Sequence, residues 1–229
     1  MARMLLLISV GMLLLVGCQQ APVVERPPMP NLDGPQVLPP EQPVATAPIP
    51  STSPTPSPKP RIAEIPREWL PQAPIRHWRW IVIHHSATAF GSAEQFDRAH
   101  RQKGWDELGY HFVIGNGAGS GDGQIEPGPR WSKQKWGAHT KTPDNQFNDF
   151  GVGICLVGDF DVQRPTPAQI QSLTRLVAYL MKTYRIPADH VIGHGDAKPT
   201  HCPGLHLHVA DIRQRATILA QTPYALNGR

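Results

Sequence analysis

A glycine- and proline-rich segment near the C-terminus carries two side chains that can hold a metal ion. His194 and Cys202 stand eight positions apart within residues 193–204, and a loop of that length can fold back on itself. A third donor is available far upstream, in the adjacent histidines His84 and His85. Two imidazoles and one thiolate are ligands that Zn²⁺ accepts, and three protein ligands leave its fourth position open for water. The sequence therefore predicts a zinc-dependent hydrolase.

A short apolar run precedes His84, and another precedes His194. These runs predict the strands that position the two histidines. Residues 79–84 and 190–193 are rich in β-branched side chains, which is typical of buried strands. We expect further strands at 110–114 and 151–157, and a hairpin partner at 124–126 beyond the glycine-rich residues 116–123.

Three segments carry the periodicity or the start signals of helices. The clearest has Thr166 as N-cap, Pro167 at the first helical position and Gln169 at the third, followed by apolar residues at a 3.6-residue period as far as Tyr184. We also expect helices from Ser92 to Lys103 and from Leu207 to Leu219. Strands separated by helices predict a single α/β domain, which we place at residues 62–222.

The first 18 residues have the pattern of a secretory signal. Arg3 precedes an apolar run of about 13 residues, which is too short for a membrane span of about 20 residues. Residues 15–18, Leu-Val-Gly-Cys, resemble the lipobox of bacterial lipoproteins, so we expect Cys18 to be lipidated and to anchor the chain to a membrane. This places the protein in the cell envelope, facing the periplasm or the exterior. The alternative is an ordinary signal peptide with an incidental cysteine.

A proline-rich linker is expected at residues 19–61. Fourteen of the 42 residues from Gln19 to Pro60 are proline and none is aromatic, so the segment buries too little apolar surface to offset its ordering entropy. Such linkers lean toward extended polyproline II. The sequence thus predicts a disordered tether between the anchor and the domain.

The formal net charge of +4 comes from 22 basic and 18 acidic residues that are scattered along the chain. A nucleic-acid-binding protein would concentrate its positive charge in a stripe or cluster, so we expect no nucleic-acid partner. The excess favours long-range attraction to anionic polymers of the cell envelope. We expect a monomer.

Four motifs occur in the order and spacing of one known family. They are Ile-His-His-Ser-Ala-Thr at 83–88, Gly-Tyr-His-Phe at 109–112, Gly-Ala-His at 137–139, and the segment 193–204. Together they resemble the type-2 N-acetylmuramoyl-L-alanine amidases, which include phage lysozyme-type amidases and peptidoglycan recognition proteins. The resemblance implies a mixed central β-sheet flanked by helices, with zinc in a groove. It also implies hydrolysis of the amide between N-acetylmuramic acid and L-alanine in peptidoglycan or in muropeptides.

When the family's motifs are matched to this sequence residue by residue, the resemblance implies that His84, His194 and Cys202 bind the zinc. It implies that Tyr110 orients the attacking water or stabilises the oxyanion. Thr200 stands where family members carry Lys or Thr, and its hydroxyl is expected to support the same negative charge more weakly than a lysine.

The resemblance further suggests that His139 and Asn148 contact the glycan or the peptide stem. Gly151 departs from the family pattern, which usually has a serine there. His85 is expected to point away from the metal, because successive side chains of a strand face opposite sides.

Two other functions remain open at this stage. The first alternative is a non-catalytic lipoprotein that binds or senses peptidoglycan. The second is a zinc peptidase that acts on other amides. A disulfide between Cys155 and Cys202 is also conceivable in an oxidising compartment. We expect instead a free, buried Cys155, since it lies in an apolar run.

Overall fold

The computed structural model describes residues 65–221. The expected signal at 1–18, the linker at 19–61 and the lipidation site Cys18 lie outside the described residues, so these three stay predictions. Within the described part, every helix is too short or too polar to cross a membrane.

A five-stranded mixed sheet forms the centre of the domain, in the order β3-β2-β4-β1-β5. Its strands are β1 (Trp80–His85), β2 (Phe112–Ile114), β3 (Ile125–Pro127), β4 (Gly151–Leu156) and β5 (Val191–Gly193). β1 pairs in parallel with both β4 and β5, and β2 pairs in parallel with β4. β3 alone runs antiparallel, as the hairpin partner of β2. The predicted α/β class with a mixed central sheet is confirmed.

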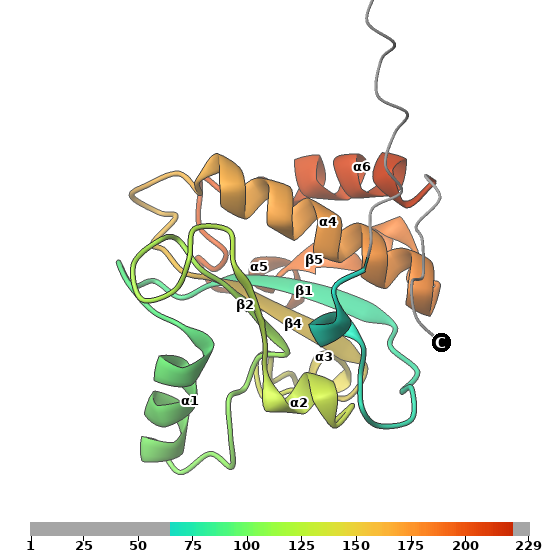
Figure 1. The fold of residues 1–229 in the computed structure, drawn as a ribbon, viewed down its shortest axis with the longest axis horizontal. Helices are drawn as coiled ribbons and strands as arrows, with labels where there is room; N and C mark the ends of the chain where they lie inside the picture. The colour runs from blue at the N-terminus through green and yellow to red at the C-terminus, as the bar shows by residue number, and fades with distance from the viewer. Residues whose placement is uncertain (1–64, 222–229) are drawn as a thin grey trace, which may run out of the picture. The chain divides into compact units, whose positions relative to one another are not determined.

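The helices flank this sheet on both sides (Figure 1). They are α1 (Ala93–Gln102), α2 (Pro129–Ser132), α3 (Gln146–Asp149), α4 (Pro167–Tyr184), α5 (His194–Ala197) and α6 (Val209–Ala220), with two 3-10 turns, η1 (Arg67–Trp69) and η2 (Ala188–His190). α4 and α6 lie side by side on one side of the sheet, and α2 lies on the other. The sheet therefore separates a thick helical layer from the side that carries α2.

The start of α4 follows the sequence signals closely. The hydroxyl of Thr166 accepts a hydrogen bond from the backbone N–H of Gln169 at 3.0 Å, and the Gln169 side chain accepts one from the N–H of Thr166 at 3.2 Å. This capping box satisfies donors that the first helical turn leaves unpaired. α1 forms only half of such a box: Ser92 accepts from the N–H of Gln95, but the Gln95 side chain does not return the bond.

Strand alternation decides which side chains face the helical layer. Ile81 and Ile83 of β1 belong to the main core, together with Leu176 and its neighbours on α4. Val82 belongs to a separate cluster on the other side of the sheet, so His84 also faces away from α4. The long helix α4 thus covers one face of the sheet, and His84 lies on the opposite face.

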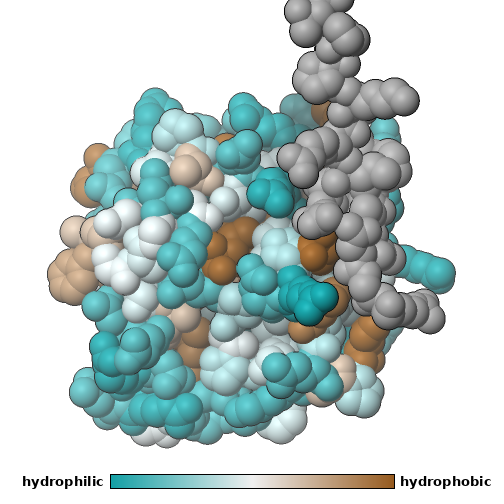
Figure 2. Space-filling view, viewed as in Figure 1, coloured by the Kyte–Doolittle hydropathy of each residue, from teal (hydrophilic) through white to brown (hydrophobic). Residues whose placement is uncertain are grey.

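The surface in the view of Figure 2 is mostly hydrophilic, and its hydrophobic side chains form small separate patches. The described residues form no broad apolar area on this face. The expected monomer stays a prediction.

Candidate metal centre

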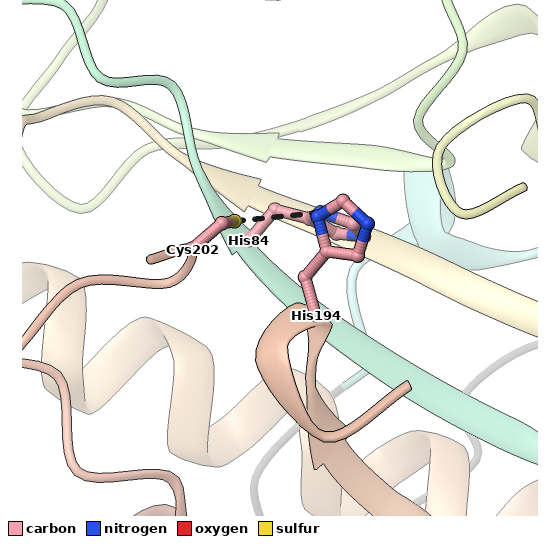
Figure 3. A group of neighbouring side chains, drawn as sticks. All are labelled: His84, His194 and Cys202. Atoms are coloured by element: carbon pink, nitrogen blue, oxygen red, sulfur yellow. Dashed lines mark hydrogen bonds between the residues drawn. The ribbon is translucent and has the colours of Figure 1, made fainter. Parts of the chain in front are cut away.

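Three donor side chains meet at the ends of two neighbouring strands. His84 lies near the end of β1, and His194 directly follows β5, which pairs in parallel with β1. Cys202 comes from the loop after α5. One ligand atom from each of the three residues lies within 4.8 Å of the other two, and 3.6 Å separates the Sγ of Cys202 from the Nδ1 of His84. Figure 3 shows the three side chains pointing toward one another.

The loop that carries Cys202 is held closed by its own backbone. The N–H of Gly195 donates to the carbonyl oxygen of Cys202 at 2.7 Å, which joins the start of α5 to the end of the loop. The carboxylate of Asp196 accepts from the N–H of Gly193 at 2.8 Å and fixes the entry into α5. The sulfur of Cys202 accepts from the N–H of His85 at 3.4 Å. The eight-residue separation therefore closes as the sequence predicts.

The electrostatics of the three donors suit a divalent cation. Burial, followed by the neighbouring His139 and His194, lowers the pKa of His84 well below its usual 6.5. Burial also lowers the pKa of His194 to about 4, so both imidazoles are neutral at pH 7. The Nε2 atom of His194 is buried and has no hydrogen-bond partner among the described residues. A bound metal would supply the missing partner. Two neutral imidazoles and a thiol fit zinc, with one position left for water.

Zinc binding at this site is expected to release one proton near neutral pH, and that proton comes from Cys202. Burial raises the pKa of the thiol to about 11, whereas both histidines have already lost their protons. The apparent zinc affinity should therefore rise about tenfold per pH unit between about pH 6 and pH 9, and fall more steeply in acid once His194 is protonated. Competition titrations with a chromophoric chelator across this range measure the slope. A flat profile would contradict the assignment of Cys202 as a ligand.

Tyr110 lies beside the donor set, in the loop just before β2. Its ring centroid is 5.2 Å from that of His84. Burial, and then the nearby thiols Cys155 and Cys202, raise the pKa of Tyr110 well above its usual 10. The phenol therefore stays protonated at neutral pH, as a hydrogen-bond donor must.

Thr200 is exposed, and its hydroxyl accepts a hydrogen bond from the N–H of Cys202 at 3.3 Å. Because the hydroxyl oxygen accepts this bond, its own O–H proton is free to donate to another group near Cys202. The position is compatible with the role that the resemblance implies, which stays a prediction.

The structure places His139 differently from the expected groove wall. Its side chain is buried, with 8% of the residue exposed. The ring lies behind His84, with its Nδ1 at 3.1 Å from the Nε2 of His84 and its Nε2 at 3.2 Å from the carbonyl oxygen of Gly151. These contacts assign the ring of His139 a place beside His84 and β4, and the expectation that it also contacts substrate stays a prediction.

Asn148 also lies among protein groups, and its expected contact with substrate stays a prediction. It is buried, and its side-chain oxygen accepts from the N–H groups of His139 at 2.9 Å and Thr140 at 2.8 Å. Its side-chain nitrogen donates to Asn145 at 2.9 Å. All of these partners are protein groups, so Asn148 holds the segment that carries His139. At Gly151 a Cβ would lie 2.3 Å from the carbonyl oxygen of Phe147, so this position has no room for a side chain.

His85 points to the opposite side of the sheet, as alternation predicts. Its Nδ1 accepts from the N–H of Phe160 at 3.1 Å, a residue of the main core. Cys155 and Cys202 are both free, so the disulfide alternative is not observed and the expected buried thiol at Cys155 is confirmed. Cys155 pairs with His84 across β4 and β1, and therefore faces the same side as the metal ligands.

A pocket of about 580 Å³ is lined by Tyr110, whose ring lies beside that of His84. α1 supplies much of its wall, through residues that include Phe96, His100 and Lys103. The structure brings His100 into this wall: its Nδ1 accepts from the N–H of Gly109 at 3.0 Å, which leaves Nε2 as the remaining donor. The signal was present in the sequence, because residues 96, 100 and 103 share one face of a helix.

Comparisons with known proteins agree with this geometry. Residues 73–205 match the family described as N-acetylmuramoyl-L-alanine amidase. The chain is 33% identical over 135 residues to an endolysin of Klebsiella phage KP32, a match that covers 56% of this chain and 81% of the endolysin. It is 31% identical over 136 residues to peptidoglycan-recognition protein LB of Drosophila melanogaster, covering 55% of this chain but only 54% of that relative's length. Among solved structures, N-acetylmuramoyl-L-alanine amidase LysC from Clostridium intestinale URNW aligns with a TM-score of 0.54 at 30% identity, covering 69% of this chain and 99% of the other.

Proposed function

Because this chain belongs to the N-acetylmuramoyl-L-alanine amidase family, we propose that it hydrolyses the amide between N-acetylmuramic acid and L-alanine, using a zinc ion held by His84, His194 and Cys202. Family membership by itself supports amidase activity or binding directed at peptidoglycan. The proposal goes further by assigning hydrolysis and a metal to this chain. The observation that carries it is the convergence of three suitable donor atoms within 4.8 Å of one another.

An amide is a poor electrophile, and water is a poor nucleophile. A zinc ion in such a site lowers the pKa of bound water toward about 7 and polarises the carbonyl oxygen. The chain's own contribution is to hold three ligands in place and to leave one side open. Tyr110, whose ring lies beside that of His84, also lines the pocket that His100 borders.

The protein groups that act on the reacting amide are hydroxyl donors. The negative oxygen that develops during attack is stabilised by preorganised donors in a dry site. Tyr110 is partly buried and protonated, so its O–H supplies such a donor beside His84. Thr200 supplies a weaker, exposed one next to Cys202. Lys103 at the wall of the pocket favours the carboxylates of a peptide stem.

The direct test is digestion of purified peptidoglycan by the isolated domain, residues 61–229. We expect released stem peptides with a free N-terminal L-alanine, identified by mass spectrometry. A zinc chelator should abolish the release, and added zinc should restore it. Binding to sacculi without any released peptide would overturn the proposal and favour a non-catalytic binding protein. Equal cleavage of unrelated peptides would favour a general zinc peptidase.

A further inference from the structure

A buried histidine that binds no metal contacts the metal ligand His84 from behind. Within the described residues, the Nε2 of His84 has two side-chain partners: the Nδ1 of His139 at 3.1 Å and the hydroxyl of Thr140 at 3.3 Å. That hydroxyl is in turn 3.0 Å from the Nδ1 of His139. On the far side of the ring, the Nε2 of His139 is 3.2 Å from the carbonyl oxygen of Gly151. The contacts form a chain from His84 to the backbone of β4.

Only one placement of protons satisfies the whole chain. The Nε2 of His139 faces a carbonyl oxygen, which can only accept, so this nitrogen carries the proton. The Nδ1 of a neutral His139 is then an acceptor, and the Nε2 of His84 must donate to it. His84 is thereby left with a free electron pair on Nδ1, the atom that lies 3.6 Å from the sulfur of Cys202. The buried contacts thus select the tautomer of His84 that can bind a metal on the side of Cys202.

The surroundings of His139 are shaped to hold its ring in this one position. A Cβ at Gly153 would lie 2.3 Å from the Cδ2 atom of His139, and a Cβ at Gly137 would lie 2.4 Å from it. A larger residue at either position would force the ring of His139 to move. Asn148 fixes the backbone of the same segment through its bonds to the N–H groups of His139 and Thr140. Two glycines and one buried amide therefore fit the ring tightly.

We infer that His139 is a positioning residue, which orients His84 and fixes its protonated nitrogen at Nε2 so that Nδ1 is available to the metal. The inference rests on the metal site of the proposed function. A ligand imidazole usually donates its other ring N–H to a carboxylate, a carbonyl or a water, and loss of such a partner lowers metal affinity about 10–100-fold. Here the partner is a second imidazole, itself held by a backbone carbonyl.

The test compares zinc dissociation constants of the full chain and three variants, measured by competition with a chelator. His139→Leu removes the acceptor and should weaken zinc binding about 10–100-fold. His139→Asn retains an amide oxygen near the position of Nδ1 and should stay within about threefold of the unmodified chain. His111→Leu is the control: His111 is also buried and packs against the ring of His139, accepts from the N–H of Gly153 and donates to the carbonyl of Lys135, but has no bond to His84.

Equal zinc affinity of His139→Leu and the unmodified chain would overturn the inference, as would an equal loss in His111→Leu. If His139→Leu fails to fold, long-range ¹H–¹⁵N spectra of the unmodified, metal-free chain at neutral pH decide. A proton on Nε2 of His84 supports the inference, and a proton on Nδ1 overturns it. A chain that binds zinc with this pattern and leaves peptidoglycan intact would refute the proposed function alone.

Discussion

Replacing Cys202 with serine is expected to remove zinc and abolish amide cleavage together, while the fold remains. The thiolate is the single anionic ligand of the set, and a serine hydroxyl stays protonated and neutral beside the same metal. Structural zinc sites with about four ligands are worth about 10–16 kcal/mol, so loss of one ligand removes about 3–4 kcal/mol, or about 10²–10³-fold in affinity. Without bound metal, cleavage should fall to the background of the assay.

The matched control for this change is Cys155→Ser. Cys155 is a free thiol on the same side of the sheet, opposite His84 in the register of β1 and β4, but it is outside the group of three donors. Zinc content by mass spectrometry of the native protein should be one ion per chain in the control and none in Cys202→Ser at equal total zinc. Full cleavage by Cys202→Ser would remove the basis for a catalytic metal. Unchanged binding to sacculi by that variant is expected, because the pocket wall is untouched.

The choice of His84 over His85 as ligand could be made from the sequence, and the reason is elementary. In β1 the apolar residues Ile81 and Ile83 must face the core, so His85 faces the core with them and His84 faces the other side. The capped start of α4 was equally accessible, because Thr166, Pro167 and Gln169 act within one turn. Features set by neighbours along the chain, or by a period of two, are those that a sequence predicts well.

The placement of His139 and Asn148 could not be predicted in this way. Both positions depend on the absence of side chains elsewhere: the ring of His139 fits only because Gly153 lies on β4 and Gly137 two residues earlier in its own segment. A glycine in a sequence does not say which distant ring occupies the space it leaves. The strand expected at 110–114 is shorter in the structure, Phe112–Ile114. The three donors of the proposed metal site could thus be named from motifs, while the residues that contact them required the packed structure.

The second large effect is expected from Tyr110→Phe. This variant should still bind zinc, but its rate of amide cleavage should fall. The substitution removes one hydroxyl and leaves the ring that contacts His84 and lines the pocket. Zinc content and fold should therefore be unchanged. If the phenol stabilises the developing oxyanion, its loss lowers kcat about 10²–10³-fold with little change in KM.

Tyr184→Phe provides a matched control, because it removes a buried hydroxyl at the end of α4, outside the donor set and the pocket. Single-turnover cleavage of a defined muropeptide by both variants separates chemistry from product release. Full activity of Tyr110→Phe would show that the metal and the other donors suffice, and Thr200 would then be the hydroxyl to examine. A loss of zinc in Tyr110→Phe would instead assign the tyrosine to the support of His84. The expected combination, intact metal with slow chemistry, is the one result that places the phenol on the reacting amide, because neither a packing role nor a ligand-supporting role produces it.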